Sequence, residues 1–197
     1  MKIINTKFKD LKIIQQKKHK DKRGNLRETF IKKIIKWDEL IFDYTTTSKK
    51  NVLRGFHFQS KFKQVKFVSV LKGKILDCVL DLRKKSKTFG KSFFIELSEK
   101  NCRSLYIPEG FAHAYYSFSD LNIIYYKLSN YYYPEYEDGI VWNDKSLKNK
   151  PSDWIENMNN NYTSLLDDYE REEIGTDKKL KEKVQKLEFS LKVKREF

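Results

Sequence analysis

Residues 68–82, "VSVLKGKILDCVLDL", decide the fold class. Two runs rich in Val, Ile and Leu flank Lys72-Gly73-Lys74, and turn residues between two such runs are typical of a tight connection between strands. The flanking runs are too short to be helices of ordinary length. We therefore predict two strands joined by a hairpin turn at Gly73.

The same pattern extends on both sides of this stretch, from residue 1 to about 144. A period of two, with turn signals at short intervals, favours a chain of short strands. Residues 19–25 read as a loop with a glycine turn, and residues 32–43 as a short helix. The strand-like runs are 8–17, 26–31, 52–59, 66–83, 92–99, 104–119 and 122–133. Eight or more strands with little helix predict an all-β fold, an antiparallel sandwich or barrel, and a jelly roll suits this number of strands.

The composition changes after Trp142, which predicts three parts. Residues 1–145 form the jelly-roll domain, residues 146–175 an irregular loop, and residues 176–197 a helical tail. In the tail, Leu180, Val184, Leu187 and Leu191 recur at spacings of four, three and four. Such a stripe packs on its own domain or on a dimer mate, or else binds a separate partner; the repeat is too short to be stable alone.

The bulk composition narrows the class of protein. A chain of 197 residues with 39% hydrophobic and 15% aromatic residues folds into a domain of ordinary size. The net charge of +14 invites a nucleic-acid partner, but the basic residues are scattered and no binding motif accompanies them. No apolar run is long enough to span a bilayer and no signal core is present, so we expect no membrane and a cytoplasmic location. Cys78 and Cys102 are expected to be buried, reduced thiols.

The chain has three histidines, and one lies in "VLRGFHFQ", residues 52–59. On a regular strand, His57 and Gln59 would share one face and Arg54 the other. A bulge at Gly55 would bring Arg54 to the face of His57, which is a usual role for a strand glycine. A lone histidine among apolar residues is more often structural, so His57 gains weight only from the groups that could join it.

Those groups are a lysine and a phenol. Lys66 interrupts an apolar strand, and a run of tyrosines lies between residues 125 and 133. An imidazole can remove a proton beside a carbonyl, an ammonium can stabilise the enolate, and a phenol can return the proton. Arg23 and Arg54 could hold a diphosphate.

Four segments together resemble the dTDP-4-dehydrorhamnose 3,5-epimerase family: 52–59, 64–91, 105–119 and 131–144. In order and spacing the similarity covers roughly residues 18–144. It implies a cupin-type jelly roll, a homodimer, no metal or other cofactor, and inversion of C3 and C5 in a nucleotide-linked 4-keto-6-deoxy sugar. By position, His57 resembles the catalytic base, Lys66 the enolate-stabilising lysine and Tyr132 the general acid. The residues expected to bind substrate are Arg23, Glu28, Arg54, Gln59, His113, Tyr126 and Glu137.

The chain also departs from the family pattern. Phe42 and Tyr44 stand where the family typically has Gln and Asn, and the stretch whose Asp orients the catalytic histidine is absent; Ser164 to Asp167 is only loosely similar. The nucleotide, the sugar and the number of inverted carbons therefore stay open. The alternatives are a single-carbon epimerase of a GDP- or CDP-sugar, a 3,4-ketoisomerase, and a non-catalytic sugar-binding jelly roll.

Overall fold

The computed structural model describes residues 1–36, 39–144 and 147. Contacts divide the chain into Met1–Ile155 and Glu156–Phe197, and all described residues belong to the first unit. The helical tail predicted for residues 176–197 lies outside the described residues, and so does nearly all of the loop predicted for 146–175.

Thirteen strands and one short 3₁₀ helix make up the described part, in which no α-helix is present. The strands are β1 (Lys2–Asn5), β2 (Lys12–Gln15), β3 (Lys18–Asp21), β4 (Gly24–Arg27), β5 (Phe42–Ser48), β6 (Leu53–Gln59), β7 (Lys66–Lys72), β8 (Lys74–Asp81), β9 (Ser92–Ser98), β10 (Arg103–Ile107), β11 (Phe111–Ser117), β12 (Asn122–Leu128) and β13 (Glu137–Gly139). The 3₁₀ helix η1 spans Pro134–Tyr136.

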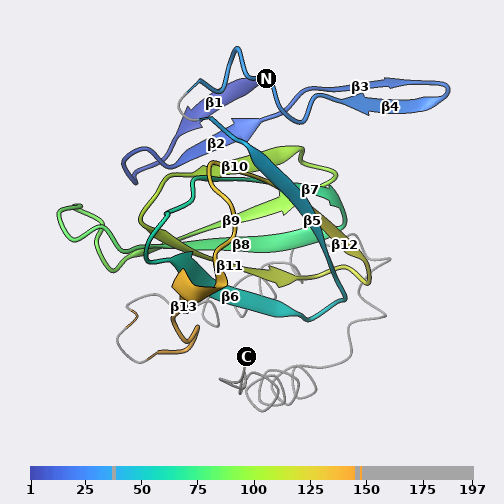
Figure 1. Cartoon of the computed structure of the whole chain (residues 1–197). Coiled ribbons are helices and arrows are strands. Elements are labelled where there is room, and N and C mark those ends of the chain that lie inside the picture. The colour runs from blue at the N-terminus through green and yellow to red at the C-terminus, as the bar shows by residue number, and fades with distance from the viewer. Residues whose placement is uncertain (37–38, 145–146, 148–197) are drawn as a thin grey trace. The chain divides into compact units, whose positions relative to one another are not determined.

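Two antiparallel sheets face each other (Figure 1). One has six strands in the order β1-β2-β10-β7-β12-β5, and the other has five in the order β13-β6-β11-β8-β9. Their facing sides enclose the main core, which includes the fully buried residues Leu11, Val68, Ile75, Leu105 and Ile124. This two-sheet architecture confirms the predicted jelly roll.

The connection at Gly73 is not the predicted hairpin. β7 pairs with β10 and β12, whereas β8 pairs with β11 and β9, so the chain passes from one sheet to the other at this point. Gly73 has a φ of +81°, and a Cβ there would lie 2.4 Å from the carbonyl oxygen of Leu121. The turn was predicted correctly, but its strands find their partners elsewhere in the chain.

Two local predictions near the N-terminus are wrong. Residues 19–25 are not a loop, because β3 and β4 pair there as a hairpin with Lys22 and Arg23 at its tip; this hairpin extends away from the two sheets in Figure 1. No helix begins at Lys32: residues 32–34 form a turn, and Phe42 opens β5. Ile35 is fully buried beside Ile14 and Phe67, so burial on the sheet replaces the helical face that the apolar spacing predicted.

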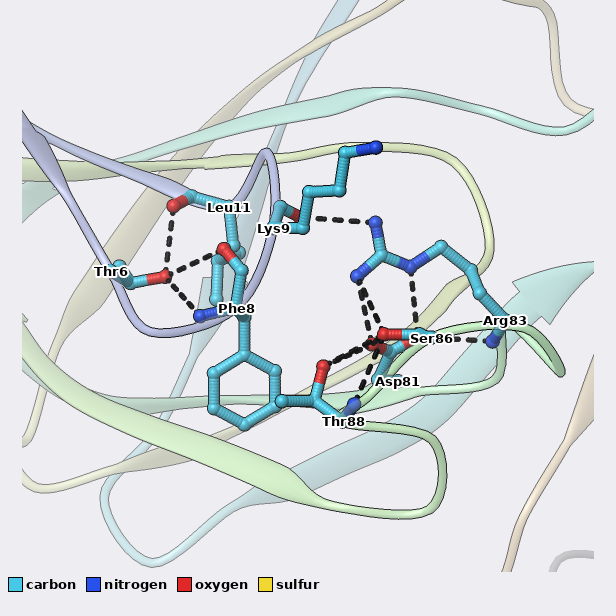
Figure 2. Close-up of polar contacts among 8 residues, drawn as sticks. All are labelled: Thr6, Phe8, Lys9, Leu11, Asp81, Arg83, Ser86 and Thr88. Carbon is cyan, nitrogen blue, oxygen red and sulfur yellow. Dashed lines mark hydrogen bonds and ion pairs between the residues drawn. The ribbon is translucent and has the colours of Figure 1, made fainter.

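The long turn after β8 is held by one buried carboxylate (Figure 2). Asp81 accepts hydrogen bonds from the Arg83 guanidinium at 2.8 and 2.9 Å, from Ser86 Oγ at 2.7 Å and from Thr88 Oγ1 at 2.6 Å. Burial alone would raise the pKa of Asp81, but these donors lower it to about 2. Since Arg83 also donates to the carbonyl of Lys9, the cluster is structural and ties the N-terminal segment to this turn.

Candidate active site

A bulge in β6 decides which of its side chains share a face. His57 lies opposite His113 and Arg54 opposite Tyr115, so Gly55 and Phe56 together face the single residue Ala114. The extra residue turns Arg54 to the side of His57, as the sequence predicted. Only glycine fits the position: its φ is +109°, and a Cβ would lie 2.4 Å from the carbonyl oxygen of His113.

A cavity of about 340 Å³ is lined by residues of both sheets, including residues of β5 and β6. Its volume is within the range of small-molecule sites. The five-stranded sheet and the segment just before β13 supply a mostly polar wall. The six-stranded sheet supplies an aromatic wall that also carries Lys66. The lining consists of Phe42, Tyr44, Thr46, Arg54, His57, Phe58, Gln59, Gln64, Lys66, His113, Tyr115, Tyr126, Tyr132 and Glu137.

His57 has a carboxylate beside it. Its Nδ1 lies 3.5 Å from Oε1 of Glu137, because β13 pairs with β6 and places Gly139 opposite His57. The side chain is 52% exposed, yet its position in the cavity lowers the pKa of the imidazole, mainly through desolvation, with Glu137 opposing the change. The imidazole is therefore held in its neutral, proton-accepting form near neutral pH.

Lys66 lies on the opposite sheet, at the start of β7, and forms no ion pair or hydrogen bond with the described residues. Desolvation lowers the pKa of its ammonium to about 8, while Glu137 and Asp77 partly oppose the shift. A desolvated ammonium without a fixed partner has its donors available for an anionic oxygen in the cavity.

His113 is held from behind by Asp77. Its Nε2 lies 2.8 Å from Oδ2 of Asp77, and the carboxylate is completely buried. Burial raises the pKa of Asp77, whereas His113 and Lys66 favour the carboxylate. The other oxygen, Oδ1, has no hydrogen-bond partner among the described residues. Asp77 was not predicted as a site residue, although it is a lone acidic residue within the apolar run 75–80.

Two tyrosines occupy different depths. Tyr126 is 3% exposed, packs edge-on against His113 at 5.9 Å between ring centroids, and has a pKa raised well above its usual value by burial. Tyr132 is 51% exposed and donates a 2.5 Å hydrogen bond to Oε2 of Glu137, which raises the pKa of its phenol to about 12. The bond to Glu137 places Tyr132 on the side of His57, whereas Tyr126 comes from the opposite sheet.

Arg54 also lines the cavity, next to Ser48 at the end of β5. Its Nε donates a 3.1 Å hydrogen bond to Oγ of Ser48, and the same hydroxyl lies 2.9 Å from the Tyr115 hydroxyl. Arg54 is exposed and forms no ion pair with the described residues. Its remaining guanidinium donors can therefore reach an anionic group of a ligand.

The cavity gathers eight of the ten residues predicted from the sequence: Arg54, His57, Gln59, Lys66, His113, Tyr126, Tyr132 and Glu137. Arg23 and Glu28 are not among its lining residues. The Arg23 side chain, at the tip of the β3–β4 hairpin, is 90% exposed and paired with Asp21. The sequence did not lead us to predict Thr46, Phe58 and Tyr115 as lining residues. The alternation of side chains along their strands could have indicated them.

Other classes of site find no support in the described part of the chain. No three His, Cys, Asp or Glu residues there lie close enough together to hold a metal ion. Both cysteines are buried and unpaired, as predicted. No helix in those residues is long and apolar enough to cross a membrane.

Fold and cavity together define a jelly-roll protein with an acid–base site between its sheets. A profile of the dTDP-4-dehydrorhamnose 3,5-epimerase family matches residues 5–168. The chain belongs to this family, and is therefore an epimerase of the isomerase class.

Several relatives are similar along most of their length. The dTDP-4-dehydrorhamnose 3,5-epimerase of Methanothermobacter thermautotrophicus is 40% identical over 148 residues, which cover 73% of this chain and 80% of that protein. The Shigella flexneri protein of the same name is 39% identical over 153 residues, covering 75% and 84%. Among solved structures, the Legionella pneumophila dTDP-6-deoxy-D-glucose-3,5-epimerase in complex with dTDP-4-keto-L-rhamnose superposes with a TM-score of 0.72 at 40% identity, covering 76% of this chain and 83% of that one.

Proposed function

We propose that the protein inverts C3 and C5 of dTDP-4-dehydro-6-deoxyglucose, giving dTDP-4-dehydrorhamnose for deoxysugar and surface-polysaccharide synthesis. One observation carries this proposal. An imidazole from one sheet and a phenol from the other face one cavity, with a half-buried lysine on the strand next to the phenol. The substrate named for the relatives, and the ligand of the Legionella structure, support the choice of nucleotide and sugar.

The chemistry follows from the acidity of a carbon next to a ketone. Neutral His57 takes the proton from C3 or C5, and the electron pair of the broken C–H bond moves into the C4 carbonyl to form an enolate. Lys66, as an ammonium, stabilises the enolate oxygen. A phenol then gives its proton to the same carbon from the opposite face, which inverts it. Hydrogen leaves and returns as a proton, so the reaction consumes no electron acceptor.

The geometry supports Tyr126 as the proton donor in preference to Tyr132. Inversion requires the acid and the base to lie on opposite faces of the sugar. Tyr126 projects from the sheet opposite His57, whereas Tyr132 shares the Glu137 carboxylate with His57 and is half exposed. The role that the sequence resemblance gave to Tyr132 stays a prediction.

Arg54 is suited to the diphosphate, at the end of the cavity away from Lys66. Arg23 and Glu28 lie on or next to a hairpin that extends away from the sheets (Figure 1), so they contribute to a nucleotide site only if the hairpin reaches the cavity of a second molecule. We therefore propose a homodimer in which the hairpins are exchanged. The predicted cytoplasmic location and independence of cofactors belong to the same proposal.

Hydrogen exchange tests the function. The protein is incubated in D₂O with dTDP-4-dehydro-6-deoxyglucose, and the product is analysed by NMR for deuterium at C3 and C5 and for configuration. We expect deuterium and inversion at both carbons, and loss of both in His57→Ala. Inversion at one carbon would favour the single-carbon epimerase, and movement of the keto group would favour the ketoisomerase. Binding without exchange would mean a sugar-binding jelly roll.

A further inference from the structure

One wall of the cavity is mainly aromatic. Strand β5 directs Phe42, Tyr44 and Thr46 into the cavity at alternate positions. The Tyr44 ring stacks on Tyr126 at 4.8 Å and 21°, Phe42 lies 5.7 Å from Tyr44, and Tyr131 lies 6.0 Å from Phe42. We call Phe42 and Tyr44 the aromatic wall.

The aromatic wall faces groups of opposite character. His57, Gln59 and Glu137 line the other side of the same cavity. Tyr44 is 37% exposed although Tyr126 covers one side of its ring, so part of its surface remains available to a ligand. Burial raises the pKa of Tyr44 to about 12, which keeps this wall uncharged at neutral pH. The cavity is thus built for a ligand with one polar and one apolar edge.

The strand register shows which part of a sugar would lie against the wall. Arg54 bonds to Ser48 at one end of β5. At the other end, Phe42 pairs with Leu128, which pairs with Lys66. A sugar with its diphosphate at Arg54 and its 4-keto oxygen at Lys66 therefore runs along β5, with Tyr44 beside the ring and Phe42 beside its far end. The far end carries C3, C4 and C5 with C6, and of its two edges the C5–C6 edge of a 6-deoxy sugar bears no hydroxyl, so this edge matches the aromatic wall while the hydroxyls of C2 and C3 face the polar side.

We propose that Phe42 and Tyr44 are specificity-determining residues, which contact the C5–C6 edge of the sugar and select a 6-methyl group over a 6-hydroxymethyl group. The proposal rests on the proposed function for the direction of the sugar. A 6-hydroxyl placed against these rings would lose its water without gaining a hydrogen-bond partner. Apolar sites reject such an added hydroxyl by a factor on the order of 100 at most.

Binding of two ligands that differ only at C6 tests this selectivity. Calorimetry with dTDP-6-deoxyglucose and dTDP-glucose measures two Kd values, and we expect the wild type to prefer the deoxy sugar by about 10- to 100-fold. Tyr44→Asn and Phe42→Gln should reduce the preference to within about 3-fold, while Tyr44→Phe keeps it because the ring remains. Phe89→Ala serves as the control, since Phe89 is exposed and lies outside the cavity lining.

Equal binding of both ligands by the wild type would overturn the proposal, and so would a Tyr44→Asn protein that loses affinity for both ligands by the same factor. Melting curves check the fold of each variant; should Tyr44→Asn unfold, the ratio for Phe42→Gln decides the question. The exchange experiment in D₂O remains separate. Wild type that binds selectively without exchanging hydrogen would contradict the proposed function and leave the selectivity standing.

Discussion

The Oε1 atom of Glu137 lies 3.5 Å from Nδ1 of His57, and its Oε2 atom accepts the hydrogen bond of Tyr132. The sequence offered no evident carboxylate for His57, and the structure supplies this one from β13. A carboxylate at Nδ1 leaves Nε2 as the nitrogen that can accept a proton from a substrate, and it stabilises the imidazolium that results.

We predict that Glu137→Gln lowers kcat by about 10- to 100-fold, the usual cost of removing such a supporting group. Because Glu137 raises the pKa of His57 against the effect of desolvation, its neutralisation should lower that pKa further. The acidic limb of the kcat/KM profile, where His57 gains its proton, should then move to lower pH. NMR titration of the His57 ring and the pH–rate profile measure both effects.

Glu109→Gln is the matched control for this change, because Glu109 is exposed and does not line the cavity. It should leave both the titration and the profile unchanged. A fall in kcat without any shift of the acidic limb would instead mean that Glu137 acts on the substrate alone.

Variants of Tyr126 and Tyr132 should show whether hydrogen exchange with solvent can occur without inversion of the carbon. With Tyr126→Phe, His57 can still remove a proton and return a deuteron to the same face, so deuterium uptake continues while inversion falls by about 10²- to 10⁴-fold. With Tyr132→Phe, inversion should keep pace with uptake. Time courses of NMR signals for label and configuration in D₂O compare the two variants. Loss of inversion specific to Tyr132→Phe would return the acid role to Tyr132.

Lys66 should set the alkaline limit of activity. The ammonium is the active form, and its pKa in the folded protein is about 8, so kcat/KM should fall as pH rises through about 8. Lys66→Arg keeps a cation that stays protonated throughout this pH range, so we expect lower activity but no decline near pH 8. A decline near pH 8 that persists in Lys66→Arg would assign this limb to another group.

The lowered pKa of Lys66 also makes the free energy of unfolding depend on pH. The folded protein binds fewer protons than the unfolded chain between pH 8 and 10.5, because burial lowers the Lys66 pKa from 10.5 to about 8. The contribution of Lys66 to the free energy of unfolding therefore rises with pH across this window. Lys66→Met should remove this rise, which denaturant unfolding at pH 8 and pH 10 can measure.

The local sequence pattern predicted most of the strands and the side chains that share a face with His57. It could not predict which distant segments pair with each other. The bulge at Gly55 could be predicted because a glycine inside a strand has few other uses. The turn at Gly73 has the same local signature whether its strands pair with each other or enter different sheets; the partners β10, β11 and β12 decide, and they lie 30 or more residues away along the chain.

The residues of the candidate site were likewise predictable only in part. The site roles of His57 and His113 were predicted from the resemblance of their motifs to the epimerase family. The contact of His57 with Glu137 depends on the pairing of β13 with β6, and that of His113 with Asp77 on the pairing of β11 with β8. The helix expected after Lys32 failed for a related reason: Ile41 donates its backbone N–H to Leu128, which starts the pairing of β5 with β12.

Gly55 tests whether the bulge controls the site. A methyl group there would meet the carbonyl oxygen of His113 at 2.4 Å and Cα of Ala114 at 2.6 Å, at a φ of +109°. Gly55→Ala should therefore lower the free energy of unfolding by about 3 kcal/mol, from backbone strain and overpacking together. Gly90→Ala is a matched control, since Gly90 has a φ of +71° with no atom within 4 Å and should lose only about 1 kcal/mol. Denaturant unfolding compares the two, and the kcat of the folded fraction shows whether Arg54 and His57 still share a face; equal losses of stability would remove the close approach at Gly55 as the cause.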